Sequence, residues 1–382
     1  MTKYLFSPGP VPLDPAVQAA NAGPVISHRS REFSALLLRL QNRLRDLLRT
    51  SGPVPVFPGS GTAALEALAV NFTGPGTTVI SFSCGVFGER FREIVKRQGA
   101  RIIPFDVDPG RACSPDDVAE ACNRYPEADV LLLTHNETST GVLNPLEEIC
   151  RALPEERPFV MVDAVSSLGM VPLYPEEWGI DAIASCSQKG LGAPPGLGIV
   201  RLSERIRSRL EKSAPPPTVF FDLDALISGL EKEEPSVPYT PPVTIIRALD
   251  AALDGMARMG YARRFESARR FARALSEGFA SMGLKLFVPE DQFRSPCVTS
   301  VEIPGKRAEE VREILRDYGI ETAGGQAGLK GRILRIGHFT DEGWPEACLL
   351  LGSFWSACKR AQISVDELDL RKCLEAFGKE EA

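Results

Sequence analysis

The hydrophobic pattern predicts a series of short buried strands in the first half of the chain. Residues 78–82, 130–133 and 159–162 are short, almost continuous apolar runs, which are typical of strands covered on both faces. Residues 182–186 and 198–202 are two further predicted strands. Helical stretches lie between several of these strands, and such alternation favours a mostly parallel sheet with helices on both sides.

The helices are predicted from apolar residues that recur at helical spacing. Residues 31–49 place phenylalanine and leucine on one face and arginine on the opposite face. Residues 89–98 and 146–153 are further predicted helices between the apolar runs. In open parallel sheets the ligands bind at the carboxyl ends of the strands, so the residues directly after each strand are the first candidates for a site.

The second half of the chain indicates a smaller α/β unit. Proline-rich segments at 214–224 and 237–243 interrupt the earlier pattern, and a long helical run from about Thr244 to Met282 is expected to link two domains. The predicted elements beyond it are strands near 299–303 and 332–336 and helices at 308–318 and 345–361. A chain of 382 residues commonly divides into two domains.

These patterns predict an N-terminal arm over residues 1–20, a large domain over 21–245, and a linking helix with a small C-terminal domain over 246–382. The large domain is expected to contain a mostly parallel sheet of about seven strands.

Composition excludes several functional classes. Hydrophobic residues make up 43% of the chain and charged residues 25%, which is ordinary for a globular protein. The formal net charge is −6 without a long basic run, so nucleic-acid binding is not expected. No apolar stretch of about 18 residues suggests a membrane span, and early prolines argue against a signal peptide. We therefore expect a cytoplasmic protein.

Cysteine and histidine usage argues against disulfides and metal sites. The nine cysteines are scattered without a CxxC pair, which is typical of reduced thiols. The three histidines have no ligand-like neighbours, so no catalytic metal is expected. Reactive chemistry would then come from an organic cofactor.

A glycine-rich segment, Pro58 to Glu66, follows a short strand and opens a helix. The first helical N–H groups can hold an anion, and Ser60 and Thr62 add hydroxyl donors for a phosphate. A plain strand-to-helix turn is the simpler alternative. GSGTAA also fits a dinucleotide-binding fingerprint, but that motif needs an acidic residue at the end of the next strand, where residues 80–84 have none.

Asp163 and Lys189 follow two successive predicted strands. Each residue alone has an ordinary explanation, as a turn cap and as a solvated lysine. Together they place a carboxylate and an amine at neighbouring strand ends. Pyridoxal phosphate (PLP) requires that pair, because an amine forms a Schiff base with the aldehyde and a carboxylate keeps the pyridine nitrogen protonated.

Three further features have chemical interpretations beside structural ones. Phe87 lies between glycines after a strand and could stack on a flat ring or fill the core. The polar loop 135–141 could bind a ring hydroxyl or lie at the surface. Arg335 lies within an apolar strand, where it needs a substrate carboxylate or a structural ion pair.

The order of these motifs resembles the class V branch of the fold-type I PLP enzymes, and most of all the alanine–glyoxylate and serine–pyruvate aminotransferases. The matching motifs are PGP (8–10), GSGTAALEA (59–67), CGVFGERF (84–91), NETSTGVL (136–143), VDAVSSLG (162–169), SQKGLGAPPGLG (187–198), PYTPPV (238–243) and LRIG (334–337). They extend over nearly the whole chain.

The resemblance implies a role for each matching residue. Lys189 would bind PLP covalently, Asp163 would pair with the pyridinium, and Phe87, where many relatives have tryptophan, would cover the ring. The residues implied at the phosphate are Ser60, Gly61, Thr62 and Gln188. Those implied at the rest of the site are Thr138 near the ring hydroxyl, Val165 on the other ring face, and Arg335 with Gly9 at the substrate. The family also implies a homodimer, with Thr240 and Tyr239 supplied by the partner subunit.

The expected reaction moves an amino group from a small amino acid, such as alanine or serine, to glyoxylate or pyruvate. Aminotransferases for aspartate or an aminophosphonate are alternatives, and so is a PLP lyase or cysteine desulfurase on the same fold. A desulfurase needs a cysteine shortly before the substrate arginine, and residues 321–331 contain none. A nicotinamide dehydrogenase is disfavoured because the ribose-binding acid is absent.

Overall fold

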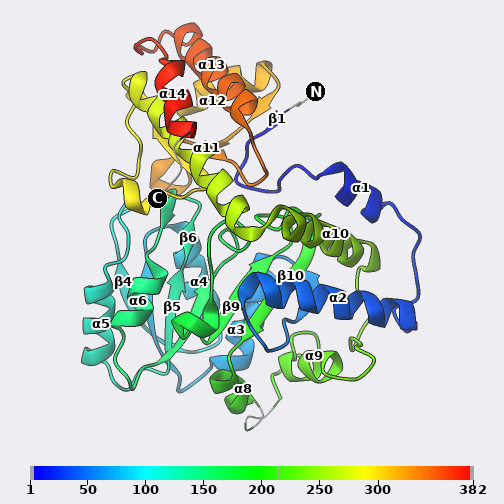
Figure 1. The fold of residues 1–382 in the computed structure, drawn as a ribbon. Coiled ribbons are helices and arrows are strands. Elements are labelled where there is room, and N and C mark those ends of the chain that lie inside the picture. The colour runs from blue at the N-terminus through cyan, green and yellow to red at the C-terminus, as the bar shows by residue number, and fades with distance from the viewer. Residues whose placement is uncertain (1–3, 211, 213–214, 379–382) are drawn as a thin grey trace.

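The fold is described from a computed structural model. It describes residues 4–210, 212 and 215–378, so the outermost residues of the predicted arm and of the predicted C-terminal domain (1–3 and 379–382) lie outside the described residues, as do 211 and 213–214. Figure 1 shows a lower part built around a sheet and an upper part built mainly from the C-terminal third of the chain.

The lower part contains a seven-stranded sheet with the order β2-β10-β9-β8-β5-β3-β4. Its strands are β2 (Val56–Gly59), β3 (Thr78–Ser83), β4 (Arg101–Asp106), β5 (Val130–Thr134), β8 (Phe159–Asp163), β9 (Ala182–Cys186) and β10 (Gly196–Leu202). The pairs from β4 to β9 are parallel, whereas β10 is antiparallel to both β9 and β2. The prediction of a mostly parallel sheet is confirmed.

Helices cover both faces of this sheet. One face packs on α2 (Arg31–Leu48), α5 (Pro115–Arg124), α6 (Leu146–Ala152) and α10 (Val243–Met259). The other face packs on α3 (Gly61–Phe72), α4 (Val86–Arg97), α8 (Glu204–Leu210) and α9 (Leu223–Leu230). Successive strand residues enter opposite cores: Leu131 joins the first and Leu132 the second. This explains why the predicted strands are apolar at nearly every position.

The remaining short elements of the first 200 residues lie around the sheet. They are α1 (Pro15–Asn21), α7 (Pro175–Trp178) and the hairpin formed by β6 (Asn136–Glu137) and β7 (Val142–Leu143). The hairpin directly follows β5 and therefore projects from the carboxyl edge of the sheet.

The upper part has its own core. Its antiparallel sheet has the order β11-β14-β13, formed by β11 (Val298–Glu302), β14 (Ile333–Gly337) and β13 (Ala323–Gly324). The helices that pack on it are α11 (Tyr261–Ser281), α12 (Ala308–Asp317), α13 (Trp344–Arg360) and α14 (Leu370–Gly378). The strand β1 (Tyr4–Leu5) pairs in parallel with β12 (Ile320–Glu321), so the N-terminal arm is attached to the C-terminal part.

The expected single helical run over 244–282 is wrong in one respect. The chain forms two helices there, α10 and α11, which are separated at Gly260. Gly260 has φ of 89°, a conformation that ends an α-helix and favours glycine. The domain boundary near residue 245 stays a prediction. The helix α10 begins near this residue and packs on the core of the large sheet.

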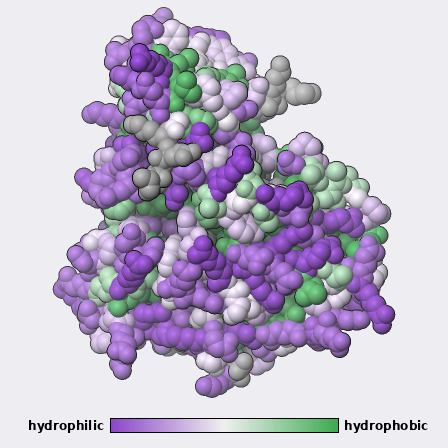
Figure 2. Space-filling view, viewed as in Figure 1, coloured by the Kyte–Doolittle hydropathy of each residue, from purple (hydrophilic) through white to green (hydrophobic). Residues whose placement is uncertain are grey.

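The surface, the cysteines and the potential metal ligands bear on the expectations drawn from composition. Figure 2 shows a face covered mainly by hydrophilic residues, with hydrophobic residues in small separate groups. Within the described residues, no helix has both the length and the apolar character needed to cross a membrane. None of the nine cysteines forms a disulfide in the described part of the chain. The described residues contain no cluster of three or more potential metal ligands.

Candidate active site

A cavity of about 230 Å³ lies at the carboxyl edge of the large sheet. Its walls come from the N-terminal arm, the first turns of α3 and α4, the β6–β7 hairpin and the loops after β8 and β9. The predicted site residues that line it are Gly9, Ser60, Gly61, Thr62, Phe87, Thr138, Asp163, Val165, Gln188 and Lys189. The structure therefore brings most of the predicted set into one space.

Lys189 follows β9, and the N-terminal arm covers its side chain. Its Nζ donates a hydrogen bond to the carbonyl oxygen of Pro8. A β-carbon at Gly9 would lie 2.5 Å from Lys189 Cδ and would displace the lysine, and the φ of 108° at this position favours glycine. Arg264 of α11 donates to the carbonyl oxygen of Gly190 (2.9 Å) and thereby holds the loop that carries the lysine.

Asp163 is the last residue of β8 and is only 3% exposed. Its Oδ1 accepts a hydrogen bond from the N–H of Val165 (2.9 Å). Burial raises the pKa of Asp163 to about 7, although the Val165 N–H opposes the shift by stabilising the charged form.

The amine of Lys189 is displaced in the complementary direction. Burial lowers the pKa of Lys189, and the positive charge of Arg335 lowers it as well, whereas Asp163 opposes both effects. The cavity therefore contains an acid that ionises less readily and an amine that loses its proton more readily than in water. Groups displaced in this way by burial beside a cavity are typical of catalytic sites.

One end of the cavity is built to hold an anion. Ser60 caps α3, and its hydroxyl accepts a hydrogen bond from the N–H of Ala63 (3.4 Å). Thr62 lies in the first turn of the helix, where N–H groups and the helix dipole favour negative charge. Gln188 Oε1 is buried and has no hydrogen-bond partner within the described part of the chain. This amide oxygen is an acceptor, so it leaves a place for a hydrogen-bond donor in the cavity.

Phe87 and Val165 supply apolar surface from two different elements. Phe87 was predicted to lie in a glycine loop before a helix at Glu89, but α4 already begins at Val86, so Phe87 belongs to its first turn. Arg90 lies one turn later, with its guanidinium carbon 4.9 Å from the centroid of the Phe87 ring. This is a cation–π distance and restricts the ring.

Arg335 lies beside the cavity and is not part of its lining. Its Nη1 donates to the carbonyl oxygen of Thr138 (2.8 Å) and its Nε to that of Gly324 (2.9 Å). Among the residues that the structure describes, no carboxylate forms an ion pair with it, so the structural ion pair considered from the sequence is not present. Burial lowers the pKa of Arg335 to about 10, and the negative charge of Glu137 opposes this.

Thr240 and Tyr239 do not reach the cavity of their own chain. Thr240 lines a separate groove with Val25 and His28. The Tyr239 hydroxyl donates to the carbonyl oxygen of Phe220 (3.0 Å), and the two rings stack with centroids 4.7 Å apart. Their predicted role on a partner subunit therefore stays a prediction.

Several residues that support the site were not identified from the sequence. Arg264 anchors the lysine loop, Arg90 restrains Phe87, and Glu137 accepts hydrogen bonds from the start of α4. Of these three residues, only Glu137 lies in a segment that the sequence marks as a candidate site, the polar loop after the apolar strand at 130–133. The partners of Arg264 and Glu137 come from distant parts of the chain, whereas Arg90 contacts a residue one turn earlier on its own helix.

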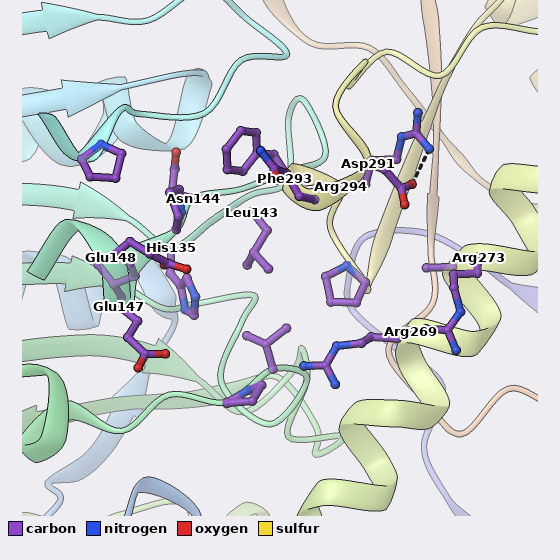
Figure 3. A pocket seen from close by; sticks show the side chains of 18 of the residues that line it. His135, Leu143, Asn144, Glu147, Glu148, Arg269, Arg273, Asp291, Phe293 and Arg294 are labelled. Carbon is purple, nitrogen blue, oxygen red and sulfur yellow. Dashed lines mark hydrogen bonds and ion pairs between the residues drawn. The ribbon is translucent and has the colours of Figure 1, made fainter. Parts of the chain in front are cut away.

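A larger cavity of about 630 Å³ lies next to the β6–β7 hairpin. Figure 3 shows Arg269 and Arg273 of α11 on one side of it and His135 on the other. Both arginines pair with Glu266, at 3.7 Å and 2.8 Å. None of the predicted cofactor or substrate residues lines this cavity, so the smaller one is the candidate site.

Comparison with known proteins places this geometry in context. The family model "Aminotransferase class-V" matches residues 16–337. An uncharacterized aminotransferase of Methanocaldococcus jannaschii is 36% identical over 99% of this chain and 98% of its own. Alanine–glyoxylate aminotransferase of Callithrix jacchus is 31% identical over 88% of this chain and 82% of its own. The crystal structure of ureidoglycine–glyoxylate aminotransferase from Bacillus subtilis superposes with a TM-score of 0.91 at 28% identity, covering 98% of both chains.

The raised pKa of Asp163 predicts how stability changes with pH in the absence of ligand. The unfolded carboxyl titrates near 4 and the native one at about 7, so between these values the native state binds more protons and the free energy of unfolding falls as pH rises. Asp163→Asn removes this loss. The free energy of unfolding of the variant, minus that of the wild type, should therefore be larger at pH 8 than at pH 4. We expect the increase to reach roughly 4 kcal/mol.

Urea unfolding of ligand-free protein at several pH values measures this difference. The buried histidines titrate equally in both proteins and cancel. A difference that does not change between pH 4 and pH 8 contradicts the raised pKa.

Proposed function

The chain belongs to the class V aminotransferase family, and from this premise we propose that it moves an amino group from a small amino acid, such as alanine or serine, to glyoxylate or pyruvate with the help of PLP. The observation that carries the proposal is the convergence of Lys189 and Asp163 on one buried cavity that also has an anion-binding end. The family implies PLP as the cofactor.

The residues around the cavity fit PLP. The start of α3 with Ser60 and Thr62 offers N–H and hydroxyl groups suited to a phosphate, and Gln188, whose side-chain amide also has N–H donors, lines the same cavity. Phe87 and Val165 offer apolar surface for an aromatic ring. Asp163 would hold the pyridine nitrogen and Lys189 the aldehyde carbon. When bound, PLP supplies an electron-withdrawing ring that makes the α-proton of the amino acid acidic.

Lys189 has the properties of the base that moves this proton. Its burial and the nearby Arg335 favour the neutral amine, which is the form that can accept a proton. Asp163 has the opposite task, because its carboxylate must face a positive charge. That charge would lower the pKa of Asp163 again, since an opposite charge within a few ångströms stabilises the ionised carboxyl.

Arg335 is the residue that we assign to the substrate carboxylate. Its two described hydrogen bonds go to main-chain carbonyl oxygens, so its positive charge is positioned but not neutralised by a carboxylate in ion-pair contact. Thr138 lines the cavity directly beside it, and Gly9 of the arm lies over Lys189. We propose that Thr138 approaches the ring hydroxyl and that Gly9 contacts the substrate.

We further propose that the enzyme is a homodimer whose partner subunit completes the phosphate site. Thr240 lies away from the cavity of its own chain, and its loop is adjacent to the exposed residue Val25. A second copy of the chain would therefore be the source of Thr240 and Tyr239.

The identity of the amino donor is the finer part of the proposal. The printed names of two relatives share glyoxylate but differ in the donor, alanine in one and ureidoglycine in the other. Arg335 would recognise the carboxylate that alanine, serine and aspartate share. Assays of these donors and an aminophosphonate against glyoxylate and pyruvate distinguish the proposal from the alternative donors. Release of alanine and sulfur from cysteine would instead indicate a desulfurase.

Replacement of the lysine tests the proposed role most simply. We expect Lys189→Ala to lower the transamination rate by on the order of 10²–10⁴-fold, because the variant lacks the base. Lys330→Ala is the control, since Lys330 is exposed and lies outside the cavity. A Lys189→Ala enzyme with near-normal turnover would show that this lysine is not the base.

Replacement of the substrate arginine should affect binding of the donor. Lysine lacks the planar fork that holds two main-chain carbonyls and a carboxylate at once. We expect Arg335→Lys to raise the KM for the amino donor by about 10–100-fold, as lost charged hydrogen bonds do. The cofactor absorbance should stay unchanged.

Arg332→Lys is the matched control, because Arg332 is at the start of the same segment and pairs with Glu302 (2.6 Å). If Arg335→Lys and Arg332→Lys have equal KM values for the donor, Arg335 does not bind the substrate carboxylate.

A mixed dimer tests the contribution of the partner subunit. Lys189→Ala and Thr240→Ala should each be impaired at limiting PLP. A mixed dimer of the two has one site with both residues intact if Thr240 acts across the interface, so up to about half of the wild-type activity should return. If no activity returns although the mixed dimer forms, Thr240 does not act in the partner's site.

A further inference from the structure

Glu137 is a fully buried carboxylate that has no place in the proposed reaction. Both of its oxygens accept hydrogen bonds. Oε2 accepts from the N–H groups of Phe87 and Gly88, each at 3.0 Å. Oε1 accepts from the N–H (3.0 Å) and the hydroxyl (2.6 Å) of Ser139. Burial raises the pKa of Glu137, and the four donors that face the side chain oppose this shift by stabilising the charged carboxylate.

These contacts replace a helix cap that α4 lacks. The residue before the helix is Gly85, which has extended backbone angles and no side chain to bind the first N–H groups. The hydroxyl of Ser139 accepts from the N–H of Val86 (3.0 Å), and Glu137 accepts from the next two. The first turn of α4 is thus capped by a hairpin that lies about 50 residues later in the chain.

Gly85 and Glu137 are sterically matched. A β-carbon at Gly85 would lie 2.6 Å from Cγ of Glu137 and 2.4 Å from the hydroxyl oxygen of Ser139. Real β-carbons do not approach so closely, so the cap from the hairpin occupies the place where a side chain at position 85 would be. Glycine at the start of α4 and glutamate in the hairpin therefore form one arrangement.

The same carboxylate is tied to the substrate side of the cavity. Thr138 lies between the two hairpin residues that make the cap, and its carbonyl oxygen accepts from Nη1 of Arg335 (2.8 Å). Glu137 is also near enough to Arg335 to stabilise its positive charge. A shift of the hairpin would therefore move Arg335 and Phe87 together.

We propose that Glu137 is a positioning residue that joins the start of α4 to the β6–β7 hairpin and so fixes Phe87, Thr138 and Arg335 relative to one another. The inference rests on the proposed function, because Phe87 would face the PLP ring and Arg335 the substrate carboxylate in the same site. Glu137 itself touches neither the cofactor nor the substrate in this account.

The test compares the same substitution in two carboxylates that accept main-chain hydrogen bonds, Glu137, which is fully buried, and Glu342, which is partly buried. Glu137→Gln places an amide, which carries N–H donors, against N–H groups of the chain. The control is Glu342→Gln: Glu342 also accepts from a main-chain N–H and a hydroxyl, both of Thr340, and it does not line the cavity. Thermal unfolding of the apoproteins measures the general structural cost of each change.

Two further measurements report on the site itself. The first is the dissociation constant of PLP for the apoprotein, and the second is the circular dichroism induced in the bound cofactor. We expect Glu137→Gln to weaken PLP binding by about 10–100-fold, to reduce the induced signal and to raise the donor KM, whereas Glu342→Gln changes none of these. Ser139→Ala, which removes one donor to Glu137 and the cap of Val86, should show the same pattern more weakly.

The outcomes separate the two proposals. If the wild-type protein does not bind PLP, the proposed function is wrong. If the wild type binds PLP and Glu137→Gln matches Glu342→Gln in affinity and induced signal, Glu137 has only a general structural role and the inference is wrong. If Glu137→Gln does not fold, Ser139→Ala decides: unchanged PLP affinity and induced signal overturn the inference.

Discussion

The register between β8 and β9 is the constraint on which the rest of the site depends. Asp163, the last residue of β8, lies opposite Ala184 of β9, so the loop that carries Lys189 leaves the sheet at the same edge as the carboxyl group. Both strands are covered by apolar cores on both faces, and a slip by one residue would turn every side chain to the wrong side. The β6–β7 hairpin reaches the same edge because it follows the parallel strand β5. The start of α3 does so because it follows β2, which runs in the same direction as β9, since β10 between them is antiparallel to both.

Burial then gives these groups their chemistry. The same exclusion of water makes Asp163 hold its proton more tightly and Lys189 hold its proton less tightly. The cost of burying charge is met by hydrogen bonds from the main chain: Arg264 and Arg335 donate to carbonyl oxygens, and Glu137 accepts from N–H groups. The site is thus held by ionic side chains that form hydrogen bonds with the backbone.

Much of this arrangement was predictable from the sequence, and the exceptions have physical reasons. The apolar runs ending at Asp163 and before Lys189 identified both strands, because a strand buried on both faces has no polar alternation. The break at Gly260 was missed because residues on both sides continue a helical pattern, and only the positive φ ends it. Glu137 was missed because its partners at the start of α4 become neighbours only through folding. The proposed role of Thr240 depends on a second copy of the chain, and no local sequence pattern reports contacts between copies.

The central claim is that Lys189 and Asp163 hold opposite ends of one PLP ring, and the attachment point of the cofactor tests it most directly. The protein should be saturated with PLP, reduced with borohydride, digested and examined by mass spectrometry. The account predicts that a single peptide, the one containing Lys189, carries the added pyridoxyl phosphate mass. A label on a different lysine, or no covalent label from a protein that binds PLP, would contradict it.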